Sequence, residues 1–162
     1  MPVVHDPADD STAGPFAVVA VPGHAPDHVV YVFGGAAFTG DAVLGAGSVF
    51  VTEQLGEYLD GLRRLAAMEL EVLCPGHGPP VWEPHAKLEE YIGHRLEREQ
   101  RLVAALEEGR RTDDELLDSA WSDAPDDLRF FATLSMRAHL GKLLAEGRLP
   151  DDFPPLPPPP RF

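Results

Sequence analysis

Cysteine is almost absent from this 162-residue sequence, in which Cys74 is the only one. A single cysteine excludes an intramolecular disulfide and a zinc finger built on cysteines, and it makes the cytoplasm the expected location. Long apolar runs are absent as well. None approaches the roughly 18 residues of a membrane-spanning helix, so no membrane partner is expected. Residues 1–10 are acidic and contain no apolar stretch, unlike a secretory signal peptide.

Positive charge is also scarce. The chain has 13 Lys and Arg residues against 27 Asp and Glu residues, which gives a formal net charge of −14. Such a charge repels phosphate backbones and keeps a protein soluble. The composition therefore argues against non-specific binding to nucleic acid, and the length suits one ordinary domain or two small ones.

Three glycine-containing blocks carry most of the chemical information. They are Pro22-Gly23-His24, Phe38-Thr39-Gly40-Asp41 and Pro75-Gly76-His77. Each block places one metal-capable side chain directly after a short apolar run that is expected to form a strand. Glycine lets the backbone bend sharply beside a bound group. The pattern therefore predicts that His24, Asp41 and His77 lie at a common rim of one sheet.

Hydrophobic periodicity predicts alternating elements around these blocks. Strands are expected at residues 16–21, 29–33, 36–39 and 71–74. Helices are expected at 53–68 and 84–108, then from Thr112 and from Pro125, with a stub of strand at Arg148-Leu149. Thr52 is expected to cap the first of these helices, and Pro84 to open the second.

Further blocks extend the pattern. Asp27-His28 follows His24, Val43-Leu44-Gly45 follows Asp41, and Tyr91-Ile92-x-His94-Arg95 lies in the second expected helix. In this order and spacing the blocks resemble the metallo-β-lactamase superfamily of zinc hydrolases. Within it they are most similar to the branch of the β-lactamase-like protein 2 endoribonucleases, which also carries a C-terminal winged-helix segment.

The resemblance implies an α/β fold of the α+β kind. Residues 1–98 would form the second half of a metallo-β-lactamase αββα sandwich, and residues 99–150 a small winged-helix-like unit. Residues 151–162 would be a proline-rich disordered tail that stays out of any core. The winged-helix-like unit has few cations on its last helix, so packing against the hydrolase part is favoured over reading nucleic acid.

The resemblance also implies roles for the three site residues. In such enzymes two zinc ions share a hydroxide whose pKa the metals lower. His24 corresponds to a ligand of the first zinc, Asp41 to the carboxylate that bridges both ions, and His77 to a ligand of the second. Imidazole nitrogen and carboxylate oxygen are donors that zinc accepts.

The first metal motif of that family, His-x-His-x-Asp-His, does not occur in the sequence, and His5-Asp6 lacks its spacing. By the resemblance, four of the expected metal ligands are therefore missing. The chain is expected to hold one zinc ion at most, weakly, where the complete family site holds two. The sheet would also lack its partner sheet, so its apolar face is expected to be exposed and to mediate self-association.

Two functional hypotheses remain open. The first is a zinc hydrolase that cleaves an ester, thioester or phosphodiester with metal-bound hydroxide, present here as a truncated form with little activity alone. Its substrate would be a small acyl compound or RNA, and the acidic balance favours the acyl compound. The alternative is a non-catalytic, degenerate half-domain that acts as an interaction or regulatory module.

The remaining histidines are weaker candidates. His5, His85 and His139 stand alone in polar segments, so they are expected to be solvated. His28 and His94 belong to the family pattern, and the sequence leaves them open between contact with a metal ligand and ordinary packing.

Overall fold

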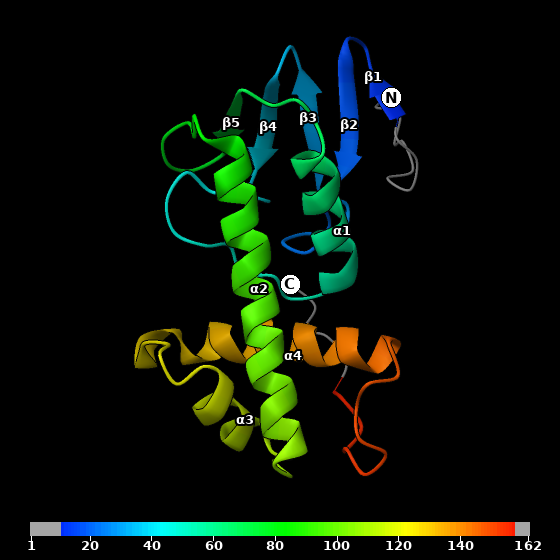
Figure 1. Ribbon diagram of the computed structural model, residues 1–162, viewed down its shortest axis with the longest axis vertical. Helices are drawn as coiled ribbons and strands as arrows, with labels where there is room; N and C mark the ends of the chain where they lie inside the picture. The colour runs from blue at the N-terminus through cyan, green and yellow to red at the C-terminus, as the bar shows by residue number, and fades with distance from the viewer. Residues whose placement is uncertain (1–10, 158–162) are drawn as a thin grey trace.

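The structure, a computed structural model, describes residues 11–157. Five strands form one sheet in the order β1-β2-β3-β4-β5. They are β1 (Ser11–Ala13), β2 (Phe16–Ala20), β3 (Val29–Phe33), β4 (Ala36–Gly40) and β5 (Val72–Pro75). Strands β1 to β4 make an antiparallel meander, and β5 pairs in parallel with β4 (Figure 1). The four strands predicted from sequence are confirmed, and β1 adds a short edge strand.

Four α-helices complete the fold. They are α1 (Leu55–Ala66), α2 (Pro84–Glu107), α3 (Asp113–Ala120) and α4 (Arg129–Ala145), with a 3₁₀ turn at Asp126–Leu128. Helices α1 and α2 lie over one face of the sheet, and α4 crosses near the lower part of α2 (Figure 1). The predicted mixed α and β fold is confirmed.

The helix boundaries follow the local signals in two places and depart from them in one. Pro84 opens α2, and Thr112 forms a capping box with Glu115 at the start of α3. Thr52 was predicted to cap α1, and this is wrong. The helix begins after Gln54, while the Thr52 N–H donates a 3.1 Å hydrogen bond to the Gly23 carbonyl. Thr52 therefore ties the start of α1 to the turn that carries His24.

Three strands share one direction and so build a rim. Strand β3 is antiparallel to both β2 and β4, while β5 is parallel to β4. The carboxyl ends of β2, β4 and β5 therefore reach the same edge of the sheet, the edge nearer α4 in Figure 1. The turns after these three ends carry His24, Asp41 and His77, as the sequence predicted.

Two hydrophobic clusters share α2. The first packs α1 and the early part of α2 onto the sheet, through residues that include Val19, Val30, Leu59, Leu62, Leu73 and Leu88. The second joins the late part of α2 to α3 and α4, through residues that include Leu102, Leu116, Met136, Leu140 and Leu143. Because α2 is continuous, the predicted division between residues 98 and 99 falls within one helix, and a division into two parts stays a prediction.

The opposite face of the sheet is apolar and open. The strand register aligns Val18, Tyr31, Phe38 and Cys74 across β2 to β5, while the alternate residues Val19, Val30 and Leu73 are buried beneath the helices. The ring of Phe16 lies 5.5–6.2 Å from the rings of Tyr31, Phe33 and Phe38. We call Phe16, Tyr31, Phe33 and Phe38 the aromatic face.

The aromatic face is unusual for a surface. Tyr31, Phe33 and Phe38 are 41%, 53% and 44% exposed. Contiguous apolar patches on soluble proteins generally mark interaction sites. The exposed sheet face that the sequence predicted is therefore present.

The predicted strand at Arg148-Leu149 is wrong, since the described part of the chain has no strand after β5. Gly147 closes α4, and Leu149 packs against the second cluster instead. A winged-helix-like unit therefore lacks a wing strand within residues 11–157.

The segment after α4 also contacts the helices. Phe153 and Leu156 pack against the second cluster, and Arg111 pairs with Asp152 at 3.0 Å. The expectation that this segment stays out of any core is wrong for these two apolar residues. Residues 158–162 and His5-Asp6 lie outside the described residues.

His139 corrects another expectation, because it is fully buried in α4 rather than solvated. Its Nδ1 lies 2.8 Å from the Ser135 carbonyl oxygen and its Nε2 lies 3.2 Å from the Arg95 carbonyl oxygen. Burial lowers the pKa of His139 to about 4, helped by the charge of Arg95 and opposed by the two carbonyl groups. His139 is therefore neutral at pH 7 and links α4 to α2.

Arg95 is the second buried polar group at this junction. Its guanidinium donates to the Ser135 hydroxyl of α4, and to the Ser48 hydroxyl and the Val49 carbonyl of the loop between β4 and α1. Burial lowers the pKa of Arg95. One turn earlier, the Tyr91 hydroxyl accepts from the Leu44 N–H at 3.1 Å and donates to the Gly47 carbonyl at 3.0 Å. Two residues on one face of α2 thus hold the loop that follows Asp41.

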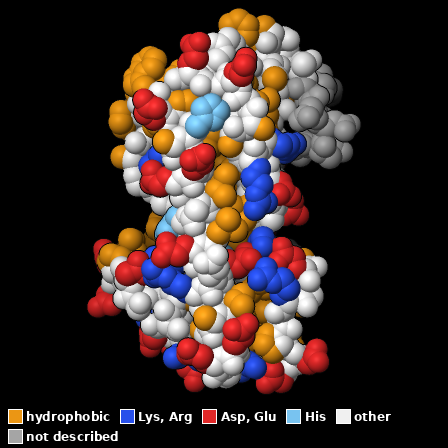
Figure 2. Space-filling view, viewed as in Figure 1, with side chains coloured by type: hydrophobic (Ala, Val, Ile, Leu, Met, Phe, Trp, Pro, Cys, Tyr) orange, Lys and Arg blue, Asp and Glu red, His pale blue; other side chains and the backbone are white. Residues whose placement is uncertain are grey.

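A third contact between α2 and α4 is ionic. Glu99 is 7% exposed and accepts from Lys142 and Arg148, both at 2.7 Å. Burial acts to raise the pKa of Glu99, but the two hydrogen bonds outweigh it and hold this pKa below its ordinary value. Acidic and basic side chains also lie next to one another around α4 on the face in Figure 2.

No helix within residues 11–157 is long and apolar enough to cross a membrane.

We expect acid to weaken the junction through His139. Between the unfolded pKa near 6.5 and the folded value of about 4, the unfolded chain binds a proton that the folded chain does not. The free energy of unfolding should therefore fall with falling pH across this window, by about 3 kcal/mol from His139. Urea unfolding of His139→Gln should show a shallower pH dependence, while exposed His85→Gln should match the parent. Identical pH slopes in all three proteins would contradict this assignment.

Replacing Arg95 should loosen the loop after Asp41. Arg95→Met leaves the Val49 carbonyl without its donor, so we expect a loss of about 2 kcal/mol in the free energy of unfolding. Faster amide hydrogen exchange around Phe50 should accompany this loss. Arg101→Met, which breaks exposed pairs with Glu97 and Asp123, should change stability by less than about 1 kcal/mol. Unchanged exchange in Arg95→Met would mean that other contacts hold the loop.

Candidate metal centre

His24 sits in the turn that follows β2. The Val21 N–H donates to the His28 carbonyl at 2.9 Å, and the Gly23 carbonyl accepts from Thr52. These bonds fix both sides of the turn, and the imidazole projects from it with 47% of its side chain exposed. The His24 side chain is therefore held by a fixed backbone while remaining open to solvent.

Asp41 follows β4 and is held more tightly. The His28 Nε2 lies 3.0 Å from the Thr39 carbonyl oxygen, and the Thr39 hydroxyl donates to the Val43 carbonyl at 2.8 Å. The buried Tyr58 hydroxyl donates to the Ala42 carbonyl at 2.8 Å. The role of His28, which the sequence left open, is thus to hold the turn that carries Asp41. Its Nε2 contacts a backbone carbonyl oxygen.

His77 follows β5 and is joined to the Asp41 loop through glycine. The Gly45 N–H donates to the His77 carbonyl at 3.0 Å. A Cβ on Gly45 would lie 2.1 Å from the Pro79 carbonyl oxygen, so only glycine permits this approach of the two loops. At Gly76 a Cβ would make a tight but less severe contact, 3.1 Å from Oδ1 of Asp41. The His77 side chain itself is 77% exposed.

The three predicted side chains converge on the Asp41 carboxylate. His77 Nε2 lies 3.5 Å from Oδ1, and His24 Nε2 lies 3.8 Å from Oδ2. Both distances exceed an ordinary hydrogen bond. Two ligands of one tetrahedral zinc, each with a bond of about 2.0–2.1 Å, lie about 3.4 Å apart. The spacing therefore suits pairs of ligands with an ion between them.

The donors form two pairs rather than one triad, because each carboxylate oxygen faces a different histidine. Accordingly, within residues 11–157 no group of three or more His, Cys, Asp and Glu side chains is arranged to hold an ion. Asp41 Oδ1 is buried, and no hydrogen bond from a described residue reaches it. A buried carboxylate oxygen ordinarily has a partner, and an ion would supply one. The residues fit zinc as a partial ligand set.

A cavity of about 530 Å³ opens beside the three side chains. Besides His24, Asp41 and His77 it is lined by Leu44, Ser48, Val49, Phe50, Thr52, Phe131 and Leu134. The loop between β4 and α1 and the start of α4 therefore line the cavity together with the rim. None of the lining residues is Lys or Arg.

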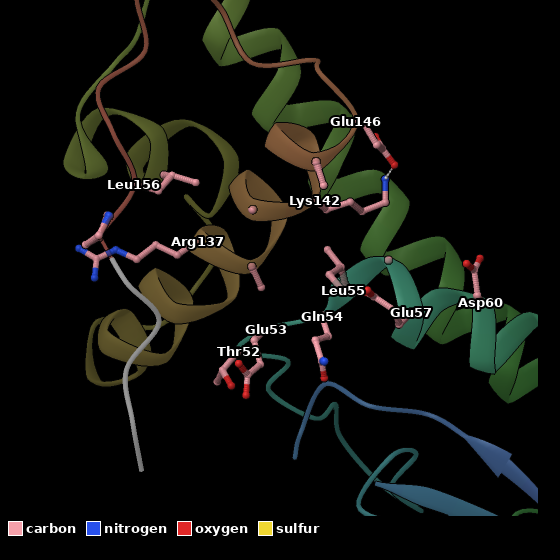
Figure 3. Close-up of a pocket in the computed structure, with 15 residues that line it drawn as sticks. Thr52, Glu53, Gln54, Leu55, Glu57, Asp60, Arg137, Lys142, Glu146 and Leu156 are labelled. Atoms are coloured by element: carbon pink, nitrogen blue, oxygen red, sulfur yellow. Dashed lines mark ion pairs between the residues drawn. The ribbon is translucent and has the colours of Figure 1, made fainter. Parts of the chain in front are cut away.

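A larger cavity of about 620 Å³ lies between the start of α1, α4 and residues 156–157 (Figure 3). It contains none of the three rim residues. Its two cations are engaged, since Lys142 pairs with Glu99 and Glu146, and Arg137 pairs with Asp113. The smaller cavity contains the three metal-capable side chains, so we take it as the candidate site.

Sequence reasoning identified the rim residues but not the parts around them. Tyr91 and Arg95 stand four residues apart in a block that the resemblance singled out, which was the available signal for a shared helix face. Phe131 lies in the helix expected from Pro125, and sequence reasoning assigned it no role at the rim. His94 is half-buried in a separate cavity of about 260 Å³, and burial lowers its pKa. Cys74 is partly exposed on the open side of the sheet.

Comparisons with known proteins agree with this architecture. The profile of the metallo-beta-lactamase superfamily matches residues 7–77. The beta-lactamase-like protein 2 homolog of Drosophila melanogaster is 33% identical over 152 residues, which cover 91% of this chain and 52% of that protein. The chain thus spans about half the length of this curated relative.

Solved structures show the same relation. A metallo-beta-lactamase family protein from Thermus thermophilus superposes with a TM-score of 0.69 at 30% identity, covering 88% of this chain and 48% of the other. A beta-lactamase domain protein from Burkholderia ambifaria shares the fold, with a TM-score of 0.72 at 22% identity, and 47% of it is covered. Together with the profile match and the rim geometry, these similarities show that the chain belongs to the metallo-β-lactamase superfamily.

Proposed function

We propose that this chain provides one half of a two-zinc hydrolase site, with His24, Asp41 and His77 as its share of the ligands. The observation that carries the proposal is the Asp41 carboxylate, whose Oδ1 faces His77 at 3.5 Å and whose Oδ2 faces His24 at 3.8 Å. A carboxylate with one histidine on each oxygen is the arrangement expected of a bridge between two ions. Zinc, when bound, would lower the pKa of a coordinated water toward neutrality.

The residues of this chain would hold the ions in position and offset their charge, but they would not supply all the ligands of the site. Asp41 supplies the negative charge that offsets the charge of two cations. The Gly45 and Thr52 hydrogen bonds keep the two histidine turns in place around it. Each pair leaves an ion short of the four ligands of a closed tetrahedral site, so further donors must come from another polypeptide segment.

The aromatic face supports the same proposal. A sheet with helices on one side and exposed Tyr31, Phe33 and Phe38 on the other is half covered. The chain spans about half the length of the relatives that it matches. We therefore propose that a segment corresponding to the unmatched half covers the aromatic face and brings a His-x-His-x-Asp-His motif to the rim. Without it, the face should drive self-association.

Zinc content tests the ligand assignment. After dialysis with zinc and then against zinc-free buffer, the 162-residue chain should retain one equivalent at most, measured by elemental analysis. Asp41→Asn should retain less than the parent, because it removes the charge and one donor oxygen from the centre of both pairs. His85→Ala, at an exposed histidine away from the rim, is the matched control. Two equivalents that resist a mild chelator would show that ligands other than these are present.

Complementation tests the half-site. We expect the chain alone to self-associate in sedimentation velocity, and Tyr31→Ser with Phe33→Ser to reduce that association. The part of the Thermus thermophilus relative that this chain does not match, supplied as a separate polypeptide, should form a complex that hydrolyses an ester, thioester or phosphodiester. Asp41→Ala should abolish this activity.

Two results would contradict the half-site. The first is hydrolysis by the chain alone at about 1 s⁻¹ or more, as a monomer. The second is a well-folded mixture of the two polypeptides that binds zinc without hydrolysing any of the three substrate types, which would favour an interaction module over an enzyme.

A further inference from the structure

The lining of the cavity beside Asp41 is of two chemical kinds. The polar residues are the rim residues His24, Asp41 and His77, together with Thr52 and Ser48. The apolar residues are Leu44, Val49, Phe50, Phe131 and Leu134, which we call the apolar wall. At about 530 Å³ the cavity falls within the range of small-molecule sites, roughly 300–1,000 Å³.

The apolar wall contains an aromatic pair drawn from two segments that are distant in the sequence. The rings of Phe50 and Phe131 stack with centroids 4.6 Å apart and planes at 25°. Phe50 precedes α1, whereas Phe131 belongs to the first turn of α4. Phe130 then packs edge-on against Phe131 at 5.5 Å and is 62% exposed. Helix α4 thus contributes directly to the surface that faces the rim.

This pair is not ordinary core. Phe50 is 37% exposed and Phe131 40% exposed, whereas neighbouring Val49 and Leu134 are 5% and 4% exposed. Aromatic rings gain considerable free energy from burial. Covering these two half-exposed, stacked rings with an apolar group would therefore be favourable in free energy.

The charges around the cavity restrict what that group can be. The lining holds one carboxylate and no Lys or Arg. Arg95 lies close by, but its guanidinium is engaged by Ser48, Val49 and Ser135. The chain as a whole carries a net charge of −14. A polyanion such as RNA would find no compensating cation on the wall, whereas an uncharged hydrocarbon would need none.

We infer that Phe50 and Phe131 form an acyl-binding subsite that receives the uncharged, apolar acyl group of an ester or thioester, and that α4 sets its size. The claim that this acyl group belongs to a substrate rests on the proposed function, since the rim would then hold the scissile carbonyl. The claim that the subsite binds an apolar acyl chain depends only on the residues of the apolar wall. The two can therefore be tested separately.

The test measures binding without metal or turnover. The 162-residue chain, in buffer with EDTA, is titrated with the hexanoyl thioester of N-acetylcysteamine and followed by ¹H–¹⁵N chemical shifts. Perturbed amides should include those of Phe50 and Phe131. Phe131→Ala should weaken binding about tenfold, as expected for the loss of one large apolar contact. Phe131→Leu, which keeps an apolar side chain, should bind within about threefold of the parent and shows that the fold tolerates substitution there.

Two controls make the result specific. Leu144→Ala removes an exposed apolar side chain from the same helix but away from the cavity, and it should leave the affinity unchanged. Phe33→Ala does the same on the aromatic face. Triuridylate, the anionic counter-probe, should produce no saturable shift at the rim.

Opposite results would overturn the inference. They are an affinity unchanged in Phe131→Ala, an affinity lost in Phe33→Ala, or triuridylate binding tighter than the thioester. Because EDTA removes metal, failure here leaves the zinc and complementation results untouched. In the complemented enzyme the same Phe131→Ala change should raise KM for the thioester without altering zinc content, whereas failure of the half-site would abolish turnover in every variant.

Discussion

The buried guanidinium of Arg95 is the contact on which the arrangement of the site most depends. It joins α2, the loop after Asp41 and α4 at one point, through Val49, Ser48 and Ser135. Burial penalises the charge there unless the guanidinium finds acceptors, and both of its terminal nitrogens, Nη1 and Nη2, do so. The loop must therefore pass where its carbonyl can accept, and that position also sets Phe50 against Phe131. One electrostatic requirement thus fixes both the support of the rim and its apolar wall.

The rim itself follows from topology. Strands β2, β4 and β5 end at the same edge, and the turns after them are joined by backbone hydrogen bonds that involve Gly23, Gly40 and Gly45. The backbone of the rim is thus organised by the chain's own hydrogen bonds. The side chains are not, since His24 and His77 remain substantially exposed and Asp41 keeps a buried oxygen without a donor. This arrangement agrees with the proposed half-site, in which His24, Asp41 and His77 would accept ions that a second segment helps to enclose.

Local signals predicted the parts of the fold that depend on neighbouring residues. The strand lengths, the start of α2 at Pro84 and the capping box at Thr112 are decided within a few residues, and the common rim follows from strand order. His139 could not be predicted in this way. Its burial depends on Arg95, which is 44 positions away, and an isolated histidine in the sequence shows no sign of such a partner. Thr52 failed as a cap for the same reason, because Gly23 lies against it. Phe131 joins the site only through the packing of α4, which periodicity cannot reveal.

The aromatic face and the rim belong to the same small sheet, and in the proposed half-site this would couple assembly to metal binding. Any segment that covers Tyr31 and Phe33 while adding donors at the rim binds more tightly when zinc is present, because the ions then bridge the two segments. By linkage, zinc is held more tightly when the face is covered. The apolar contacts and the ligands thereby act as one interaction. A substitution on the aromatic face should therefore weaken zinc retention in the assembled protein, although no residue of that face is a ligand.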